Sequence, residues 1–166
     1  MSRVLLTGAG GPAAIGVARS LALAGHQIVA VDSDRRTLPF AHANSRHLVP
    51  RADDLSYIES LQKIIKGEGV EFVHAQPDPE VRAISEHRDE LAARTLLPDH
   101  KTVLLCQDKF KMNAHLLGTG VPIPKTISLD GYDNFLDCRS LFRSEEFWIR
   151  QRTGAAGRGA WHVRPG

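Results

Sequence analysis

The sequence has few cysteines and no long apolar segment. Among its 166 residues only Cys106 and Cys138 are cysteines; their spacing fits no metal-binding motif and suits a reducing compartment. No run of 18 apolar residues occurs, so a membrane-spanning helix is not expected. Residues 1–6 are too short for a secretory signal. We therefore expect a cytoplasmic protein without a membrane partner.

The sequence also lacks a concentration of charge or of metal ligands. The net charge is only +2 and the basic residues are dispersed, so no nucleic-acid partner is expected. The eight histidines, which include His42 and His47, are not spaced as metal ligands. There is no GxSxG nucleophile elbow and no Walker lysine. We expect no catalytic and no metal-binding residues among these groups.

What the first two-thirds of the chain does contain is an alternation of strands and helices. The stretch RVLLTGAGGPAAIGVARSLALAGHQIVAVDSD predicts a buried strand at residues 4–7, a helix from Ala13 that Gly25 ends, and a second strand at residues 27–31. A β-α-β unit of this kind has a right-handed crossover, which makes its two strands parallel.

The alternation continues downstream. Strands are expected at residues 47–50 and 70–76, and residues 102–107 predict either a fifth strand or a short connection. Asp53 or Asp54 is expected to cap one helix, and Pro79 to open another that runs to about Leu91. We predict an α/β fold with a doubly wound, Rossmann-like parallel sheet over residues 1–106.

The pattern changes over residues 107–166, which we expect to form a second, α+β unit. Asp108 is placed to cap a helix that Gly118 or Gly120 ends, and Pro122 and Pro124 favour extended chain into residues 125–129. Residues 132–142 predict a helix. Residues 147–152 and 160–164 predict two strands, joined as a hairpin around residues 153–159.

Two glycine-rich turns are candidate ligand sites. The first candidate spans residues 8–16, where a dinucleotide-binding fingerprint would lie. It begins with the first glycine turn, residues 8–11, which follows a strand, and Asp32 lies where an acid that binds ribose is expected. However, Ala13 replaces the third glycine, and Pro12 removes one backbone N–H that would face a pyrophosphate. An NAD(P)-binding Rossmann protein remains an open alternative.

The second glycine turn, residues 154–159, follows a strand that ends in basic residues. In RQRTGAAGRG, three glycines and small alanines allow backbone N–H groups to approach a polyphosphate. Arg150 and Arg152 are two strand positions apart and therefore on one face. The pattern fits a nucleotide triphosphate, and equally an ordinary hairpin with solvated arginines.

Two stretches together favour the nucleotide. QDKFKMNAHLLGTGVPIPKT, followed about twenty residues later by FWIRQRTGAAGRGAWHV, resembles the opening of the ATP-grasp domain. That family carries a preceding Rossmann-like, or pre-ATP-grasp, domain, which residues 1–106 resemble. Arginine rather than lysine at position 150 is similar to carbamoyl-phosphate synthetase large subunits. Residues 107–166 then correspond to an N-terminal portion of the ATP-grasp domain.

The resemblance implies roles for individual residues. Lys109 and Arg150 would contact the ATP phosphates, and a set of loop residues would fold over them: Gly154, Gly157, Arg158 and Gly159. A second set, Gly8, Gly10 and Gly11, would face the acceptor substrate. Two departures are Ala156, where many members have glycine, and Arg152, which replaces a small residue without an evident reason.

The resemblance also implies an activity. ATP-grasp ligases activate a carboxylate as an acyl phosphate, with Mg²⁺ held by residues that are expected beyond position 166. We therefore expect the N-terminal portion of a longer ligase whose partners are ATP and a small carboxylate, and which alone binds nucleotide weakly and is inactive. Uncovered apolar surface leaves room for a homodimer. A non-catalytic module for nucleotide sensing or oligomerisation is the other open alternative.

Overall fold

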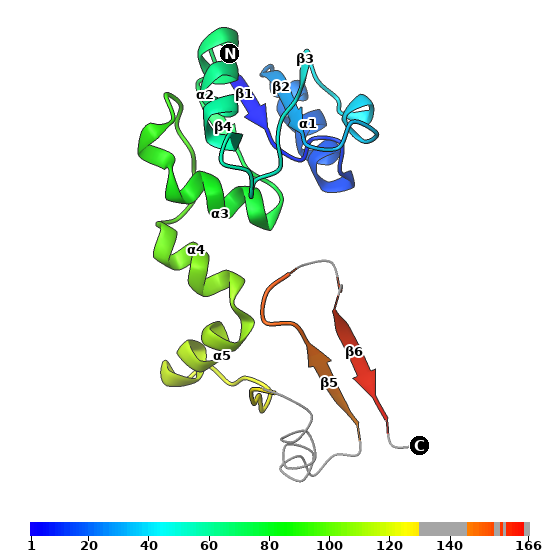
Figure 1. Cartoon of the computed structure of the whole chain (residues 1–166), viewed down its shortest axis with the longest axis vertical. Helices are drawn as coiled ribbons and strands as arrows, with labels where there is room; N and C mark the ends of the chain where they lie inside the picture. Colours follow the sequence, from blue (N-terminus) through cyan, green and yellow to red (C-terminus); the bar gives the residue numbers. More distant parts are fainter. Residues whose placement is uncertain (130–145, 155–156, 158, 165–166) are drawn as a thin grey trace. The chain divides into compact units, whose positions relative to one another are not determined.

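The computed structural model describes residues 1–129, 146–154, 157 and 159–164. The chain divides into two compact units, Met1–Val103 and Leu104–Gly166 (Figure 1). The assignment of residues 1–106 to a pre-ATP-grasp domain and of residues 107–166 to the N-terminal portion of an ATP-grasp domain stays a prediction.

The first unit is built on one parallel sheet. Its strands are β1 (Arg3–Leu6), β2 (Gln27–Asp32), β3 (Ser45–Leu48) and β4 (Phe72–His74). The strand order is β3-β2-β1-β4, and all three neighbouring pairs are parallel, with Leu5 opposite both Val29 and Val73. The predicted parallel sheet is thereby confirmed.

Helices cover both faces of this sheet. They are α1 (Pro12–Leu23), α2 (Tyr57–Glu68) and α3 (Asp78–Glu86), with short 3-10 helices η1 (Leu38–Phe40) and η2 (Arg88–Glu90). Successive strand residues point to opposite faces, so Leu5 packs with Leu61 of α2 and Ile84 of α3, while Leu6 packs with Ala14 of α1. The sheet is doubly wound, as predicted.

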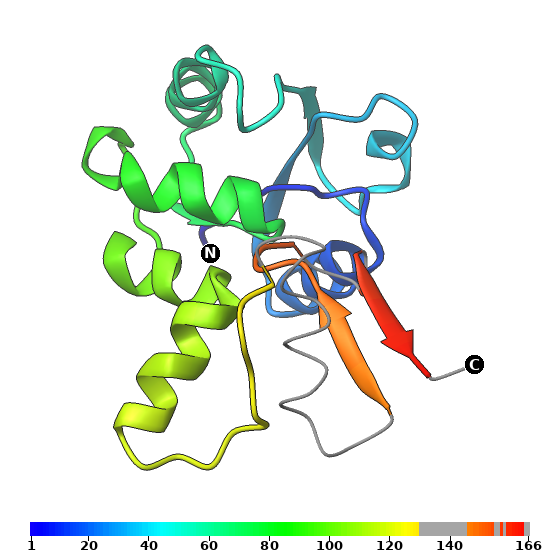
Figure 2. The same ribbon diagram turned by 60° about the horizontal axis from the view of Figure 1, so that its bottom comes forward.

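The second unit contains a helix and a two-stranded ribbon. Its elements are α5 (Lys109–Gly118), β5 (Phe147–Arg150) and β6 (Ala160–Val163), and helix α4 (His100–Gln107) spans the boundary between the units. Strands β5 and β6 are antiparallel, with Arg150 opposite Ala160, and lie side by side in both views (Figures 1 and 2). The expected hairpin strands are therefore present.

The prediction for residues 102–107 was wrong, because this segment belongs to α4. A short apolar run such as Val103 with its two leucines does not separate a strand from a helix by periodicity. The deciding signal is Asp99, whose carboxylate accepts hydrogen bonds from the Thr102 N–H at 2.9 Å and from the Thr102 hydroxyl at 2.9 Å. A carboxylate bonded to an N–H three residues later is typical of a helix start.

Other boundaries moved as well. Helix α3 ends at Glu86, short of Leu91, and η2 follows it. Residues 121–129 have no regular secondary structure. The helix predicted at residues 132–142 lies outside the described residues.

Candidate functional site: a cationic cavity beside the second glycine turn

The second glycine turn depends on backbone conformations that favour glycine. Gly154, Gly157 and Gly159 have φ angles of 105°, 71° and 68°, which other residues rarely adopt. A Cβ at Gly159 would also lie 2.5 Å from the side chain of Gln151. The Gln151 N–H donates to the Gly159 carbonyl at 2.8 Å and closes the base of the turn. The backbone conformation therefore favours glycine at all three positions, and packing against Gln151 adds to this at Gly159.

Helix α5 brings a lysine to the same turn. Asp108 caps the helix, as predicted, by accepting from the N–H groups of Phe110 at 3.1 Å and Lys111 at 3.0 Å. Lys109 is the first helical residue, and its Nζ donates to the Gly154 carbonyl at 2.6 Å. Residues 45 positions apart in sequence thus meet at one point.

Arg152 joins the turn to the start of α5. Its Nε and terminal guanidinium nitrogen donate to the two oxygens of Asp108 at 3.2 and 2.6 Å. The Lys109 N–H donates to the Arg152 carbonyl at 2.9 Å, and the guanidinium lies 5.5 Å from the centre of the Phe110 ring. Hydrogen bonding from Arg152, more than any other cause, lowers the pKa of Asp108. Arg152, unexplained by the sequence, has a structural partner.

A cavity of about 830 Å³ lies beside these groups, within the second unit. Its volume is in the range of small-molecule sites. Lys109 and Arg150 both line it, and so does Arg152. The other lining residues are Phe110, Asn113, Pro124, Lys125, Thr126, Ile127, Ser128, Leu129, Glu146, Phe147, Trp148, Ile149, Gln151, Ala160 and Trp161.

Two tryptophans also line the cavity. Trp148 and Trp161 are half or more exposed, at 67% and 56%. Trp148 stacks on His162 across the ribbon, with ring centres 4.8 Å apart and planes 14° from parallel. Trp161 pairs with Ile149, one register position further on, so the two tryptophans belong to opposite faces of the ribbon. The cavity therefore combines cations with exposed aromatic surface, which suits a nucleotide.

The sequence-predicted residues of the second unit fall into three groups. Lys109 and Arg150 line one cavity, and Gly154 is bonded to Lys109. Gly157 and Gly159 lie in the adjoining turn. Arg158 lies outside the described residues.

The first glycine turn is organised differently, because its N–H groups are bonded inside the protein. Ala9 donates to the Val31 carbonyl at 3.1 Å, and Gly11 donates to the Gly8 carbonyl at 3.0 Å. Gly10 donates to the Asp32 carboxylate at 2.9 Å. With proline next in the chain, four successive positions offer no free N–H to a phosphate.

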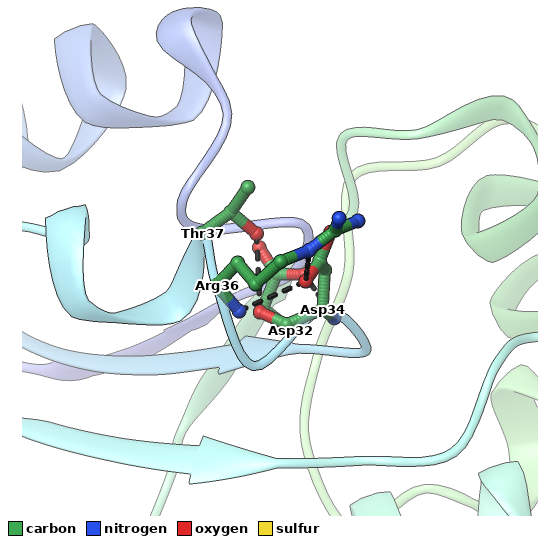
Figure 3. A network of polar contacts seen from close by, with 4 residues as sticks. All are labelled: Asp32, Asp34, Arg36 and Thr37. Carbon is green, nitrogen blue, oxygen red and sulfur yellow. Dashed lines mark hydrogen bonds and ion pairs between the residues drawn. The ribbon is translucent and has the colours of Figure 1, made fainter.

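Asp32 serves the protein rather than an external ligand. It is only 7% exposed, and its second carboxylate oxygen accepts from the Asp34 N–H at 2.8 Å. Figure 3 shows this acid with Asp34, which pairs with Arg36 at 2.9 Å and whose carbonyl accepts from the Thr37 hydroxyl. Because each oxygen already accepts a backbone N–H and the side chain is buried, little of this carboxylate is accessible to a ribose hydroxyl. This weighs against the dinucleotide reading of the turn.

A buried acid under the same turn was not foreseen. Glu80 is 6% exposed, burial raises its pKa to about 7, and the Thr7 hydroxyl hydrogen-bonds it. In the described part of the chain, its Oε2 has no hydrogen-bond partner. The helix α3 cap is Pro77, which lacks the N–H that an acid three residues later usually accepts from. The pattern Pro-x-x-Glu at the start of α3 therefore indicates an acid without its usual capping partner, and it is the sequence signal by which Glu80 could have been found.

Over residues 1–129 and the described parts of 146–164, no group of three His, Cys, Asp or Glu side chains is placed to hold a metal ion. In the same residues, no helix combines the length and apolarity needed to cross a bilayer.

The match to a protein family lies in the first unit. Residues 4–96 match the family model described as the PylC-like, N-terminal domain. The chain belongs to this family. A comparison with curated proteins gives no match. The PylC-like family match covers the sheet, the first glycine turn and Glu80, and leaves the second unit outside it.

Solved structures resemble the PylC-like chain over both units. N5-carboxyaminoimidazole ribonucleotide synthetase from Thermotoga maritima is 18% identical with a TM-score of 0.68, covering 100% of this chain and 42% of that one. N5-carboxyaminoimidazole synthetase from Staphylococcus aureus complexed with ADP is 13% identical, with a TM-score of 0.72 and coverage of 99% and 42%. L-amino acid ligase from Bacillus licheniformis is 12% identical, with a TM-score of 0.70 and coverage of 99% and 39%.

These likenesses establish the fold. The ATP-grasp resemblance read from the sequence is confirmed: the chain has the fold of the N-terminal part of ATP-grasp enzymes. The chain spans about two-fifths of the length of these structures.

Proposed function

We propose that the second unit binds the phosphates of ATP in the cavity beside the second glycine turn. Lys109 and Arg150 supply positive charge, and Gly154, Gly157, Arg158 and Gly159 form the loop that approaches the phosphates. The observation that carries the proposal is the 2.6 Å contact of the Lys109 ammonium with the turn, at the edge of a cavity that Arg150 also lines.

The side-chain cations, rather than the N-terminal N–H groups of α5, are the groups in this proposal that bind the anion. The first N–H groups of α5 are already bonded, Lys109 to the Arg152 carbonyl and the next two to Asp108. A helix N-terminus whose N–H groups are occupied has little to offer an anion. Cations held in fixed positions stabilise the negative charge that develops on a transferred phosphoryl group, and no solvent has to reorganise for this.

The parent activity in this proposal is an ATP-dependent ligase, similar to carbamoyl-phosphate synthetases, that activates a small carboxylate as an acyl phosphate. The first glycine turn, at Gly8, Gly10 and Gly11, faces that substrate in the proposal. Among the described residues, no group of three His, Cys, Asp or Glu side chains is placed to hold Mg²⁺. We expect the chain alone to bind ATP weakly and to be inactive.

The decisive test is a titration followed by tryptophan fluorescence. The chain has two tryptophans, Trp148 and Trp161, and both line the cavity, so their fluorescence reports on that site. We expect ATP to give a saturable change in fluorescence. We expect NADH to show no binding in a parallel calorimetric titration, which also detects a ligand at the first unit. Lys109→Ala should weaken ATP binding about tenfold, the loss of one charge-assisted bond.

The matched control is Lys63→Ala, which removes a lysine that pairs with Glu59 on the exposed face of α2. It should leave ATP binding unchanged. Saturable binding of NADH without binding of ATP would overturn the proposal in favour of an NAD(P)-binding protein.

A further inference from the structure

Three contacts connect residues 152–154 to the start of α5. They are the Asp108–Arg152 ion pair, the Lys109 N–H bond to the Arg152 carbonyl, and the Lys109 Nζ bond to the Gly154 carbonyl. All lie within the second unit. We call the Asp108–Arg152 ion pair and the bond from the Lys109 N–H to the Arg152 carbonyl the Arg152 tie. The third contact, from Lys109 Nζ to the Gly154 carbonyl, depends on where this tie places Gly154.

The ion pair in this tie is better placed than an ordinary surface pair. The Asp108 side chain is only 15% exposed, and it accepts hydrogen bonds from two guanidinium nitrogens of Arg152 and from two backbone N–H groups. The Asp108 carboxylate is already held as a helix cap, so it loses little further conformational freedom when it pairs with Arg152. A guanidinium that makes two hydrogen bonds to a carboxylate also fixes the relative orientation of the two side chains. The tie therefore determines the position of Gly154, two residues further along.

That position matters because the Gly154 carbonyl occupies the Lys109 ammonium. A carbonyl oxygen at 2.6 Å satisfies one donor of the ammonium. An anionic oxygen arriving at this ammonium must replace the carbonyl or share the ammonium with it. The turn and an incoming phosphate thus use the same cation.

We propose that Arg152 is a positioning residue that fixes the start of the second glycine turn on the Asp108 cap, so that the Gly154 carbonyl holds Lys109 at the cavity until a phosphate oxygen takes that carbonyl's place. This rests on the proposed function of the cavity. The tie keeps the turn and the lysine aligned, so that neither has to be ordered when the anion arrives.

The variant Asp108→Asn distinguishes a positioning role of the ion pair from a purely electrostatic effect on anion binding. Asparagine is as good a helix cap as aspartate, so α5 should persist, while the ion pair is lost. Removing a negative charge near the cavity should by electrostatics alone tighten anion binding. The positioning role requires the opposite, so the sign of the change decides between the two.

Arg152 variants complete the set. Arg152→Gln removes the charge and the two-pronged contact, whereas Arg152→Lys keeps the charge but not the fork. Arg51→Gln is the matched control, because Arg51 makes an exposed pair with Asp53 in the first unit and does not line the cavity.

The experiment titrates the full chain with inorganic tripolyphosphate and with ATP, followed by tryptophan fluorescence. We expect Asp108→Asn and Arg152→Gln to weaken both ligands about five- to tenfold, Arg152→Lys to recover part of that loss, and Arg51→Gln to change nothing. Hydrogen exchange of the Lys109 amide, which donates to the Arg152 carbonyl, should accelerate in the first two variants without ligand.

The outcomes separate the two proposals. If the unchanged chain binds and Asp108→Asn binds equally or more tightly, the positioning role is overturned and the nucleotide site stands. Full recovery by Arg152→Lys would show that charge alone acts, with the same consequence. Absence of binding by the unchanged chain overturns both. If Arg152→Gln does not fold, the sign of the Asp108→Asn effect still decides.

Discussion

The two glycine turns of this chain are similar in sequence and opposite in organisation. In the first, the N–H groups of Ala9, Gly10 and Gly11 are bonded internally, and the acids Asp32 and Glu80 lie buried beside it. In the second, the Gly154 carbonyl accepts from the Lys109 ammonium, and Arg150 and Arg152 line the adjoining cavity. Glycine content alone therefore does not decide what a turn can bind. What distinguishes the two is the charge beside each turn, buried acids at the first and cations at the second.

The largest effect on stability is expected for a substitution at Gly10 in the first glycine turn. A Cβ there would lie 2.2 Å from the Thr37 carbonyl oxygen and 2.4 Å from its carbon, both backbone atoms that cannot move aside cheaply. We expect Gly10→Ala to lower the free energy of unfolding by about 3 kcal/mol or more, measured by urea denaturation.

Gly16→Ala is the control for this change. Gly16 lies in α1 with no atom within 4 Å of its built Cβ, so alanine should raise stability by about 0.5–1 kcal/mol. A Gly10→Ala chain as stable as the unchanged one would show that the first glycine turn is not packed as described.

The second prediction concerns the buried acid of the first turn. Burial raises the pKa of Glu80 from 4.5 to about 7, so the folded chain binds this proton more tightly than the unfolded chain. The free energy of unfolding should therefore fall as pH rises from about 4.5 to 7, by about 3 kcal/mol through this group.

Glu80→Gln keeps an acceptor for the Thr7 hydroxyl but cannot ionise. It should flatten this part of the pH profile and be more stable than the unchanged chain at pH 8. Urea denaturation between pH 4.5 and 8 makes the measurement. An identical pH slope in both proteins would show that Glu80 ionises normally.

The smallest effect is expected in the second turn. Gly157 has a φ of 71°, yet its built Cβ meets no atom within 4 Å. Gly157→Ala should cost about 1–2 kcal/mol from backbone strain alone, measured as a shift of the thermal transition. Gly157→Asn should cost less, since asparagine tolerates this conformation. A loss as large as that of Gly10→Ala would remove the contrast between the turns.

The sequence predicted those parts of the fold that depend on neighbouring residues. The β-α-β start followed from the spacing of apolar residues around the first glycines, and the Asp108 cap from an acid directly before a helix. The α4 prediction failed because a short apolar run suits either state, and the Asp99 cap was not recognised.

Residues that depend on distant partners were missed. Arg152 pairs with an acid 44 positions away, and Glu80 lies against Thr7, which only the sheet order brings near it. Asp32 was placed correctly at a strand end, yet its partner, the Gly10 N–H, is visible only once the turn is folded. The local pattern Pro-x-x-Glu marks Glu80 as an acid without its usual capping partner, but no local pattern identifies the distant partners of these residues.

The position of β1 in the middle of its sheet has a consequence for synthesis. Leu5 pairs with Val29 on one side and with Val73 on the other. A nascent chain can form the first pairing early, but the second edge of β1 must wait until a segment almost seventy residues further on has been translated. During that interval the edge has an unsatisfied backbone ladder. The growing polypeptide is then most exposed to mispairing and to capture by chaperones.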